Sequence, residues 1–276
     1  LRLIYLPENT KMGYDSLRSF TFPDGAVIIK NFYYFHNATA PDKGRRIMET
    51  RLLIKETSGW KALTYIWNDD QSDAILEVAG ASIPVEWVDY EGKKRKIEYG
   101  VPNNNQCKGC HSFDGKFTPI GTSAKQLNRM VNNENQLVAW EKQGRIELPD
   151  HFDPAQAQAL NDYRKPTGQI NEAARAYLDA NCGHCHNAHG PASTSGMFLD
   201  INETNPERLG IGKPPVAAGR GSGNLKYGIV PGKPDQSILY YRLESTDPGV
   251  RMPEVGRQLA HKEGLALIKA WIEGMK

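Results

Sequence analysis

The chain has 276 residues, a formal net charge of +2 and a hydrophobic content of 39%. This length predicts two domains, and so small a net charge gives no reason to expect nucleic acid or an anionic membrane as a partner. No apolar run is long enough to cross a bilayer, so we expect no transmembrane segment.

Residues 1 to about 101 predict β-structure. Residues 26–35 are rich in β-branched and aromatic residues and follow the turn signal Pro23-Asp24-Gly25. Five further strand candidates are separated by turn residues such as Gly59, Gly80 and Gly92; they are 51–54, 62–67, 74–78, 83–87 and 96–99. The charged run at residues 90–96 indicates a solvated hairpin turn.

Two motifs of the same spacing follow, Cys-Lys-Gly-Cys-His at residues 107–111 and Cys-Gly-His-Cys-His at residues 182–186. Cys-x-x-Cys-His is the spacing that attaches a c-type haem through two thioether bonds, with the histidine as an iron ligand. We therefore predict two covalent haems c. The residues that hold them are Cys107, Cys110, His111, Cys182, Cys185 and His186.

Other uses of the paired cysteines explain the pattern less well. One four-cysteine zinc site would leave the histidine after each motif unexplained. A thioredoxin-like dithiol needs a strand before the motif, and residues 101–106 are Asn-rich with a proline.

The region between the motifs predicts short helices at 123–131 and 135–142 and a polar linker at 150–168. It does not identify the sixth ligand of the first haem. The alternatives are an open iron site or one of the residues Lys30, His36, Met48, Met130 and His151.

In the last hundred residues, 172–181 predict a helix that leads into Cys182, and 261–275 predict a helix ended by Gly274. This arrangement resembles the class I cytochrome c fold. The resemblance implies Met252, in Arg251-Met252-Pro253, as the distal ligand opposite His186, with Met197, His189 and His261 as competitors. We further expect the carbonyl group of Pro231 to accept the Nδ1 proton of His186.

The β-rich part resembles the β-sheet haem proteins, which are the 460-type hydroxylamine-oxidising cytochromes and the β-sheet cytochromes c-prime. The matching features are Phe-Pro-Asp-Gly-Ala-Val-Ile-Ile-Lys at residues 22–30, Gly59-Trp60 and the first Cys-x-x-Cys-His. The resemblance implies that a haem lies on the sheet and that Lys30 points at it. In 460-type members the matching lysine is cross-linked to the porphyrin. The alternative is an ordinary strand lysine that faces water.

Nearly the whole chain is similar to a family of bacterial diheme proteins, through residues 49–53, 126–129, 173–186 and 230–242. These resemblances together imply an α+β fold of two domains, a mainly-β haem domain followed by an all-α class I cytochrome c domain. We place the β-sheet haem domain at residues 1–122, a helical connector at 123–171 and the cytochrome c domain at 172–276.

The expected function is electron transfer between redox partner proteins. Some proteins of the resembled family are associated with extracellular polysaccharide breakdown, so one possible role is to supply or remove electrons for a carbohydrate-active oxidase. The alternatives are a haem enzyme that acts on hydroxylamine, NO or peroxide at an open first haem, with Glu49, Arg51 and Lys30 in its pocket, and a gas-binding haem sensor. Because haem is attached to such motifs outside the cytoplasm, we expect a periplasmic or secreted protein whose leader precedes this sequence. A lipid anchor on that leader is left open.

Overall fold

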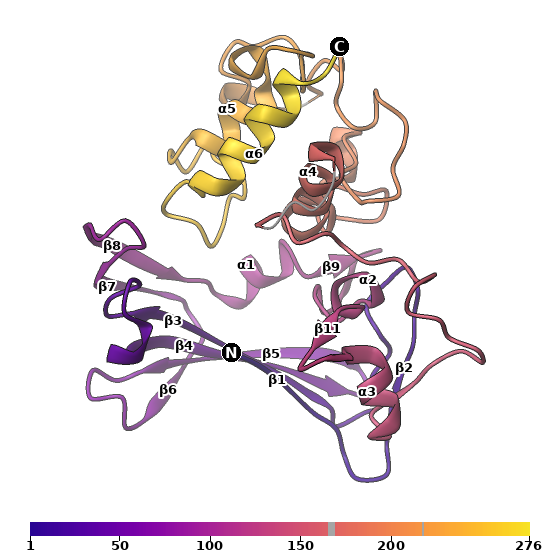
Figure 1. Ribbon diagram of the computed structural model, residues 1–276. Helices are drawn as coiled ribbons and strands as arrows, with labels where there is room; N and C mark the ends of the chain where they lie inside the picture. Colours follow the sequence, from indigo (N-terminus) through magenta and orange to yellow (C-terminus); the bar gives the residue numbers. More distant parts are fainter. Residues whose placement is uncertain (165–168, 217) are drawn as a thin grey trace. The chain divides into compact units, whose positions relative to one another are not determined.

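The computed structural model describes residues 1–164, 169–216 and 218–276 of the chain. The fold is mixed α/β, with strands in the N-terminal region and helices toward the C-terminus (Figure 1). Two compact units are present, one of residues 1–108 with 121–157 and one of residues 109–120 with 158–276. Within the described residues, every helix is too short or too polar to cross a membrane.

The first unit is built on a five-stranded antiparallel sheet with the strand order β1-β3-β4-β5-β6. Its strands are β1 (Arg2–Tyr5), β3 (Val27–Phe35), β4 (Arg45–Glu56), β5 (Gly59–Trp67) and β6 (Ala74–Glu77). The predictions that correspond to β3, β4, β5 and β6 are confirmed. These segments are rich in β-branched and aromatic side chains, which favour the extended backbone. Only β1 was not predicted.

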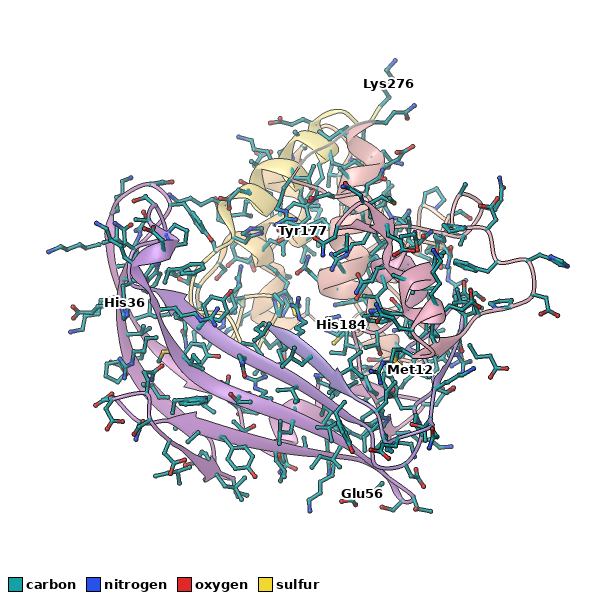
Figure 2. All side chains as sticks on the ribbon, turned by 60° about the horizontal axis from the view of Figure 1, so that its bottom comes forward. Met12, His36, Glu56, Tyr177, His184 and Lys276 are labelled. Atoms are coloured by element: carbon teal, nitrogen blue, oxygen red, sulfur yellow. The ribbon has the colours of Figure 1, made fainter. Side chains whose placement is uncertain are left out.

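A β-bulge interrupts the pairing of β3 with β4. Phe32 pairs with Glu49 and Tyr33 pairs with Ile47, so Met48 has no partner in the ladder. Strand alternation would place one of two neighbouring side chains in solvent, yet Met48 and Glu49 are both buried. Figure 2 shows His36 and Glu56 at opposite ends of this pair of strands.

A separate hairpin pairs β7 (Ala81–Val88) with β8 (Lys94–Val101). Gly92 has a φ of 76°, in the left-handed region, and its N–H donates to the carbonyl group of Asp89 at 3.0 Å. Glycine adopts that conformation without a steric penalty. The predicted turn is therefore confirmed for residues 90–93, whereas residues 94–96 of the charged run are paired in β8.

Residues 121–157 complete the core of the first unit. Leu137 of α3 (Gln136–Lys142) and Ile146 of β13 (Ile146–Glu147) are buried with Met12 of β2 (Met12–Gly13) and with Phe20. This region was expected as part of a connector at 123–171, and the structure instead packs most of it against the β unit. The hydrophobic side chains of α3 need that cover.

The predicted helix at 123–131 is mostly wrong. Helix α2 spans only Ala124–Leu127, and a small hairpin follows, made of β11 (Met130–Val131) and β12 (Glu134–Asn135). Asn132 and Asn133 both have positive φ in its turn. Asparagine tolerates that conformation well, and a helix cannot continue through it.

The second unit contains α4 (Ile170–Leu178), α5 (Ile238–Glu244) and α6 (Lys262–Glu273). Helices α4 and α6 contact each other, and the indole N–H of Trp271 donates to Asn171 Oδ1 at 2.9 Å. The core between the helices includes Leu178, Ile268 and Ile272. The two predicted helices of this region are confirmed.

The rest of the second unit is mainly loops and short elements. The segment after the first Cys-x-x-Cys-His forms a hairpin of β9 (Ser112–Phe113) and β10 (Lys116–Phe117). The short helix α1 (Asn104–Lys108), which contains Cys107, comes before this hairpin and lies at the end of the first stretch of the first unit. Part of the predicted linker, residues 165–168, lies outside the described residues.

Candidate functional site

The second motif begins where α4 widens into a π-helical turn, Asp179–Gly183. The backbone N–H groups of Cys185 and His186 both donate to the carbonyl oxygen of Cys182, at 3.0 and 2.9 Å. This compact turn presents both thiols and the imidazole from five consecutive residues. Burial raises the pKa of Cys182 to about 12, so this sulfur is a neutral thiol.

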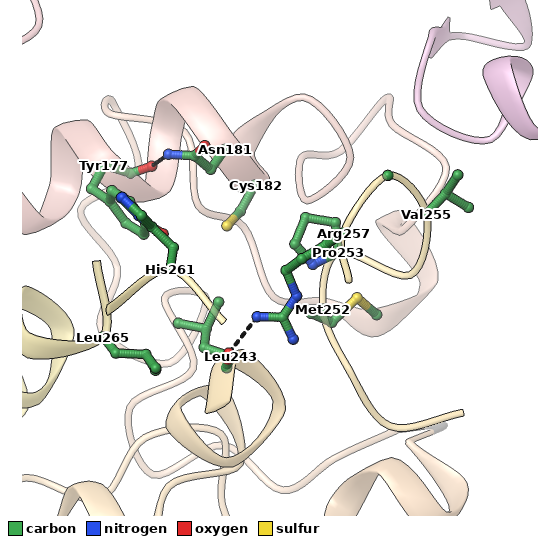
Figure 3. Close-up of a pocket in the computed structure, with 11 residues that line it drawn as sticks. Tyr177, Asn181, Cys182, Leu243, Met252, Pro253, Val255, Arg257, His261 and Leu265 are labelled. Atoms are coloured by element: carbon green, nitrogen blue, oxygen red, sulfur yellow. Dashed lines mark hydrogen bonds between the residues drawn. The ribbon is translucent and has the colours of Figure 1, made fainter. Parts of the chain in front are cut away.

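Cys182 faces a cavity of about 210 Å³. Met252, from the loop between α5 and α6, lines the same cavity, as do Tyr177, Arg257 and His261 (Figure 3). The structure therefore brings together two of the residues predicted to serve one haem, although 70 residues of chain separate them.

A cation with an unused donor lines this cavity too. The guanidinium group of Arg257 donates to the carbonyl oxygens of Leu243 and Ser245, while its Nε atom is buried without a hydrogen-bond partner among the described residues. A buried donor without an acceptor is costly. A carboxylate bound in the cavity would satisfy it.

The imidazole of His186 is held by a backbone carbonyl. Its Nδ1 atom lies 3.2 Å from the carbonyl oxygen of Met197. A carbonyl oxygen can only accept, so Nδ1 carries the proton and Nε2 carries the lone pair. The prediction that the Pro231 carbonyl accepts this proton is wrong, because the loop after the motif folds back and brings the Met197 carbonyl to this position instead. That loop is closed by the N–H of Leu199, which donates to the His186 carbonyl oxygen at 2.8 Å.

The first motif repeats this arrangement. His111 Nδ1 lies 2.9 Å from the carbonyl oxygen of Thr118, in the segment that follows the β9–β10 hairpin. The N–H of Thr118 in turn donates to the His111 carbonyl oxygen at 3.1 Å. His111 is thus oriented in the same way as His186, with Nε2 as the nitrogen that carries the lone pair. Cys107 is buried at the end of α1.

Three groups from the two motifs meet in the second unit. The side chains of Cys110, His184 and Cys185 each offer a ligand atom, and these atoms lie within 4.8 Å of one another. Hydrogen bonds from Cys185 and His184 lower the pKa of Cys110 to about 4. The cluster is a candidate site for a metal or a haem. The sequence did not predict it, because it depends on how close the two motifs come to each other in the folded chain.

A second polar cluster lies on one face of the five-stranded sheet. The fully buried carboxylate of Glu49 accepts two hydrogen bonds from Arg51, at 2.9 and 2.5 Å, and one from the Tyr99 hydroxyl at 2.6 Å. Arg51 interacts electrostatically with Cys107. This cluster therefore lies near the first motif.

Lys30 belongs to the same face, since it pairs with Arg51 in the ladder. Its Nζ atom lies 4.4 Å from the centre of the Phe32 ring. Burial, with a smaller contribution from Arg2 and Arg51, lowers the pKa of Lys30 to about 8. The side chain is thus largely covered by its neighbours, unlike a strand lysine that faces water.

The residues predicted as possible sixth ligands of a haem at the first motif differ in exposure. Met48 is buried and Lys30 is partly buried, while His36, Met130 and His151 are exposed. Sequence reasoning nominated Glu49 and Arg51 but missed Tyr99, Thr118 and Arg257. It named Met197 as a competing axial ligand and missed that its carbonyl oxygen holds His186. Only Tyr99, in an alternating strand, carried any signal of an inward side chain.

Comparison with known proteins adds no relative: no protein-family model, no curated protein and no solved structure matches this chain.

Proposed function

We propose that the protein carries two covalently attached haems c and transfers electrons between redox proteins. One observation carries this proposal: in both Cys-x-x-Cys-His motifs, a backbone carbonyl holds the histidine Nδ1 proton, at Thr118 and at Met197. This contact fixes the ring and makes Nε2 the ligand atom, as in metal-ligating histidines generally. Neither a zinc site of four cysteines nor a redox dithiol requires it.

The residues around the second motif fit a haem. The cavity walls provide a thiol from Cys182 and a thioether from Met252. Arg257 supplies a buried Nε–H donor without an acceptor among the described residues, and a haem propionate in the cavity would be one such acceptor. Cys182 and Cys185 would form the two thioether bonds, and His186 and Met252 would be the axial ligands.

When bound, the haem supplies one-electron iron chemistry, and the chain determines how it is used. With His186 and Met252 as its ligands, the iron would have no free position for a substrate. Thioether ligation by Met252 also raises the reduction potential. Both effects favour electron exchange over catalysis at the second haem. We propose a periplasmic or secreted location and a one-electron redox protein as partner, within polysaccharide oxidation.

The absorption spectrum of the pure holoprotein tests this function, recorded oxidised and reduced, with and without CO. Electron transfer predicts two haems per chain and no CO binding by the reduced protein, because both irons are six-coordinate. A preparation with fewer than two covalent haems contradicts the proposal.

The cluster on the sheet favours one alternative, a haem enzyme at the first motif. Arg51 and Tyr99 form a connected network around the buried Glu49. Lys30 beside it has a pKa of about 8, so a good fraction of this amine is neutral and nucleophilic at mildly alkaline pH. Such a set could position a small ligand such as hydroxylamine, NO or peroxide and move its protons. Binding of one CO per chain would favour this alternative.

Variants separate the two functions. Glu49→Gln keeps the shape of the side chain and removes its charge. If the first haem is catalytic, this variant loses turnover of hydroxylamine or peroxide while the second haem keeps its spectrum. If the protein only transfers electrons, Glu49→Gln leaves the rate of reduction by a one-electron donor unchanged.

A further inference from the structure

The ends of the two motifs adjoin in the second unit. Besides the cluster of Cys110, His184 and Cys185, the Cys185 sulfur lies 3.9 Å from the carbonyl oxygen of Gly109. Each of these two cysteines is the second of its motif, so each would carry the same thioether of its haem. The His184 Nδ1 atom beside them is buried without a hydrogen-bond partner among the described residues.

The segments that follow the two motifs are clasped together as well. The N–H of Asp114 donates to the carbonyl oxygen of His189 at 2.9 Å, and His189 Nδ1 lies 2.8 Å from Asp114 Oδ1. The rings of Phe113 and His189 stack with their centres 4.9 Å apart. The approach of Cys110 to Cys185 therefore rests on several contacts, and not on one flexible side chain.

We infer that Cys110 and Cys185 hold the two haems edge to edge, so that an electron passes directly between the two irons of one chain. This inference rests on the proposed function. Attachment breaks each S–H bond and adds sulfur to the vinyl carbon next to the porphyrin ring, while the hydrogen goes to the terminal vinyl carbon. The path between the ring edges would then run through one carbon and one sulfur of each attachment and across the gap between the two sulfurs, which lie within 4.8 Å of each other.

The electron step needs no atom transfer. One electron leaves the iron(II) of one haem, which becomes iron(III), and reduces the iron(III) of the other. The redox protein proposed above supplies the electron, and a second one-electron acceptor removes it. The same three side chains could bind a metal ion such as Zn²⁺ only before haem attachment, because a thioether is a poor ligand for that ion.

The test uses circular dichroism of the full-length holoprotein in the Soret region. Denaturing mass spectrometry first counts the covalent haems, and fewer than two contradicts the proposed function before the haem spacing is tested at all. With two haems present, close porphyrins predict a couplet of two lobes of opposite sign. A band of one sign, or a spectrum equal to the sum of two single-haem variants, overturns the inference.

A pair of variants tests the clasp without removing a haem. Asp114→Asn removes the charge that faces His189, and Asp69→Asn removes a more exposed surface carboxylate that pairs with Arg46 in the first unit. We expect both variants to keep two haems, the couplet to lose amplitude in Asp114→Asn, and no change in Asp69→Asn. An unchanged couplet in Asp114→Asn, or an equal loss in both variants, contradicts the role of the clasp.

Discussion

The charge of Glu49 is central to the network on the sheet, and Glu49→Gln tests its strength. The carboxylate is fully buried, while 24% of the Arg51 side chain is exposed. Removal of one partner from a buried pair costs about 3–5 kcal/mol, because the remaining charge is left uncompensated. Arg51 keeps some contact with water, so we expect a loss at the lower end, about 3 kcal/mol.

Urea unfolding, followed by far-ultraviolet circular dichroism, measures this loss. Glu86→Gln is the matched control, because Glu86 pairs with Lys96 on the surface and both side chains are mostly exposed. We expect no measurable loss in the control.

A double-mutant cycle with Arg51→Met isolates the pair. If the network is a coupled unit, the double variant loses less free energy of unfolding than the sum of the single variants, with a coupling of about 1–3 kcal/mol. The reasoning is refuted if Glu49→Gln unfolds like Glu86→Gln, or if the cycle gives no coupling.

Three further predictions concern the axial ligand, the buried lysine and the helical core. Met252→Ala should abolish the weak long-wavelength band of a methionine–iron bond and lower the reduction potential of the second haem; the exposed Met130→Ala serves as control, and a retained band contradicts the assignment. Below a pH of about 8, the folded pKa of Lys30, this amine is charged in both the folded and the unfolded protein. Between that pH and 10.5, the amine stays protonated only in the unfolded protein, so the free energy of unfolding should rise with pH in this window. Unfolding at roughly pH 7 and pH 10 should therefore show a larger rise in the native protein than in Lys30→Met, and equal rises would contradict burial of the amine. Ile268→Ala should lower the free energy of unfolding by about 2–5 kcal/mol, because it opens a cavity between α4 and α6, whereas the exposed Leu259→Ala should change it little; equal effects would argue against this core.

The sequence predicted the helices and strands whose formation depends on residues close together in the chain. Strands β3 to β8 follow from runs of β-branched and aromatic residues between glycine turns, and α6 follows from the spacing of Leu265, Ile268 and Ile272. The bulge at Met48 could not be predicted, because it depends on the register between two strands. Its consequence, a buried Glu49 next to a buried Met48, was therefore hidden as well.

The candidate site could be predicted where its residues are neighbours in the sequence or match a known family. Both Cys-x-x-Cys-His motifs, and the return of Met252 to the cavity of Cys182, could be inferred from spacing and resemblance. The carbonyl that holds His186 could not, since the path of the loop decides between Met197 and Pro231. The approach of Cys110 to Cys185 spans 75 residues, and no periodic pattern encodes it.

Denaturing mass spectrometry of the protein, produced with a haem-attachment system, tests the central claim most directly. Two covalent haems predict a chain mass increased by two haem groups, and a loss of one group in each of Cys107→Ser/Cys110→Ser and Cys182→Ser/Cys185→Ser. A chain of unmodified mass that binds Zn²⁺ through its cysteines would contradict the account.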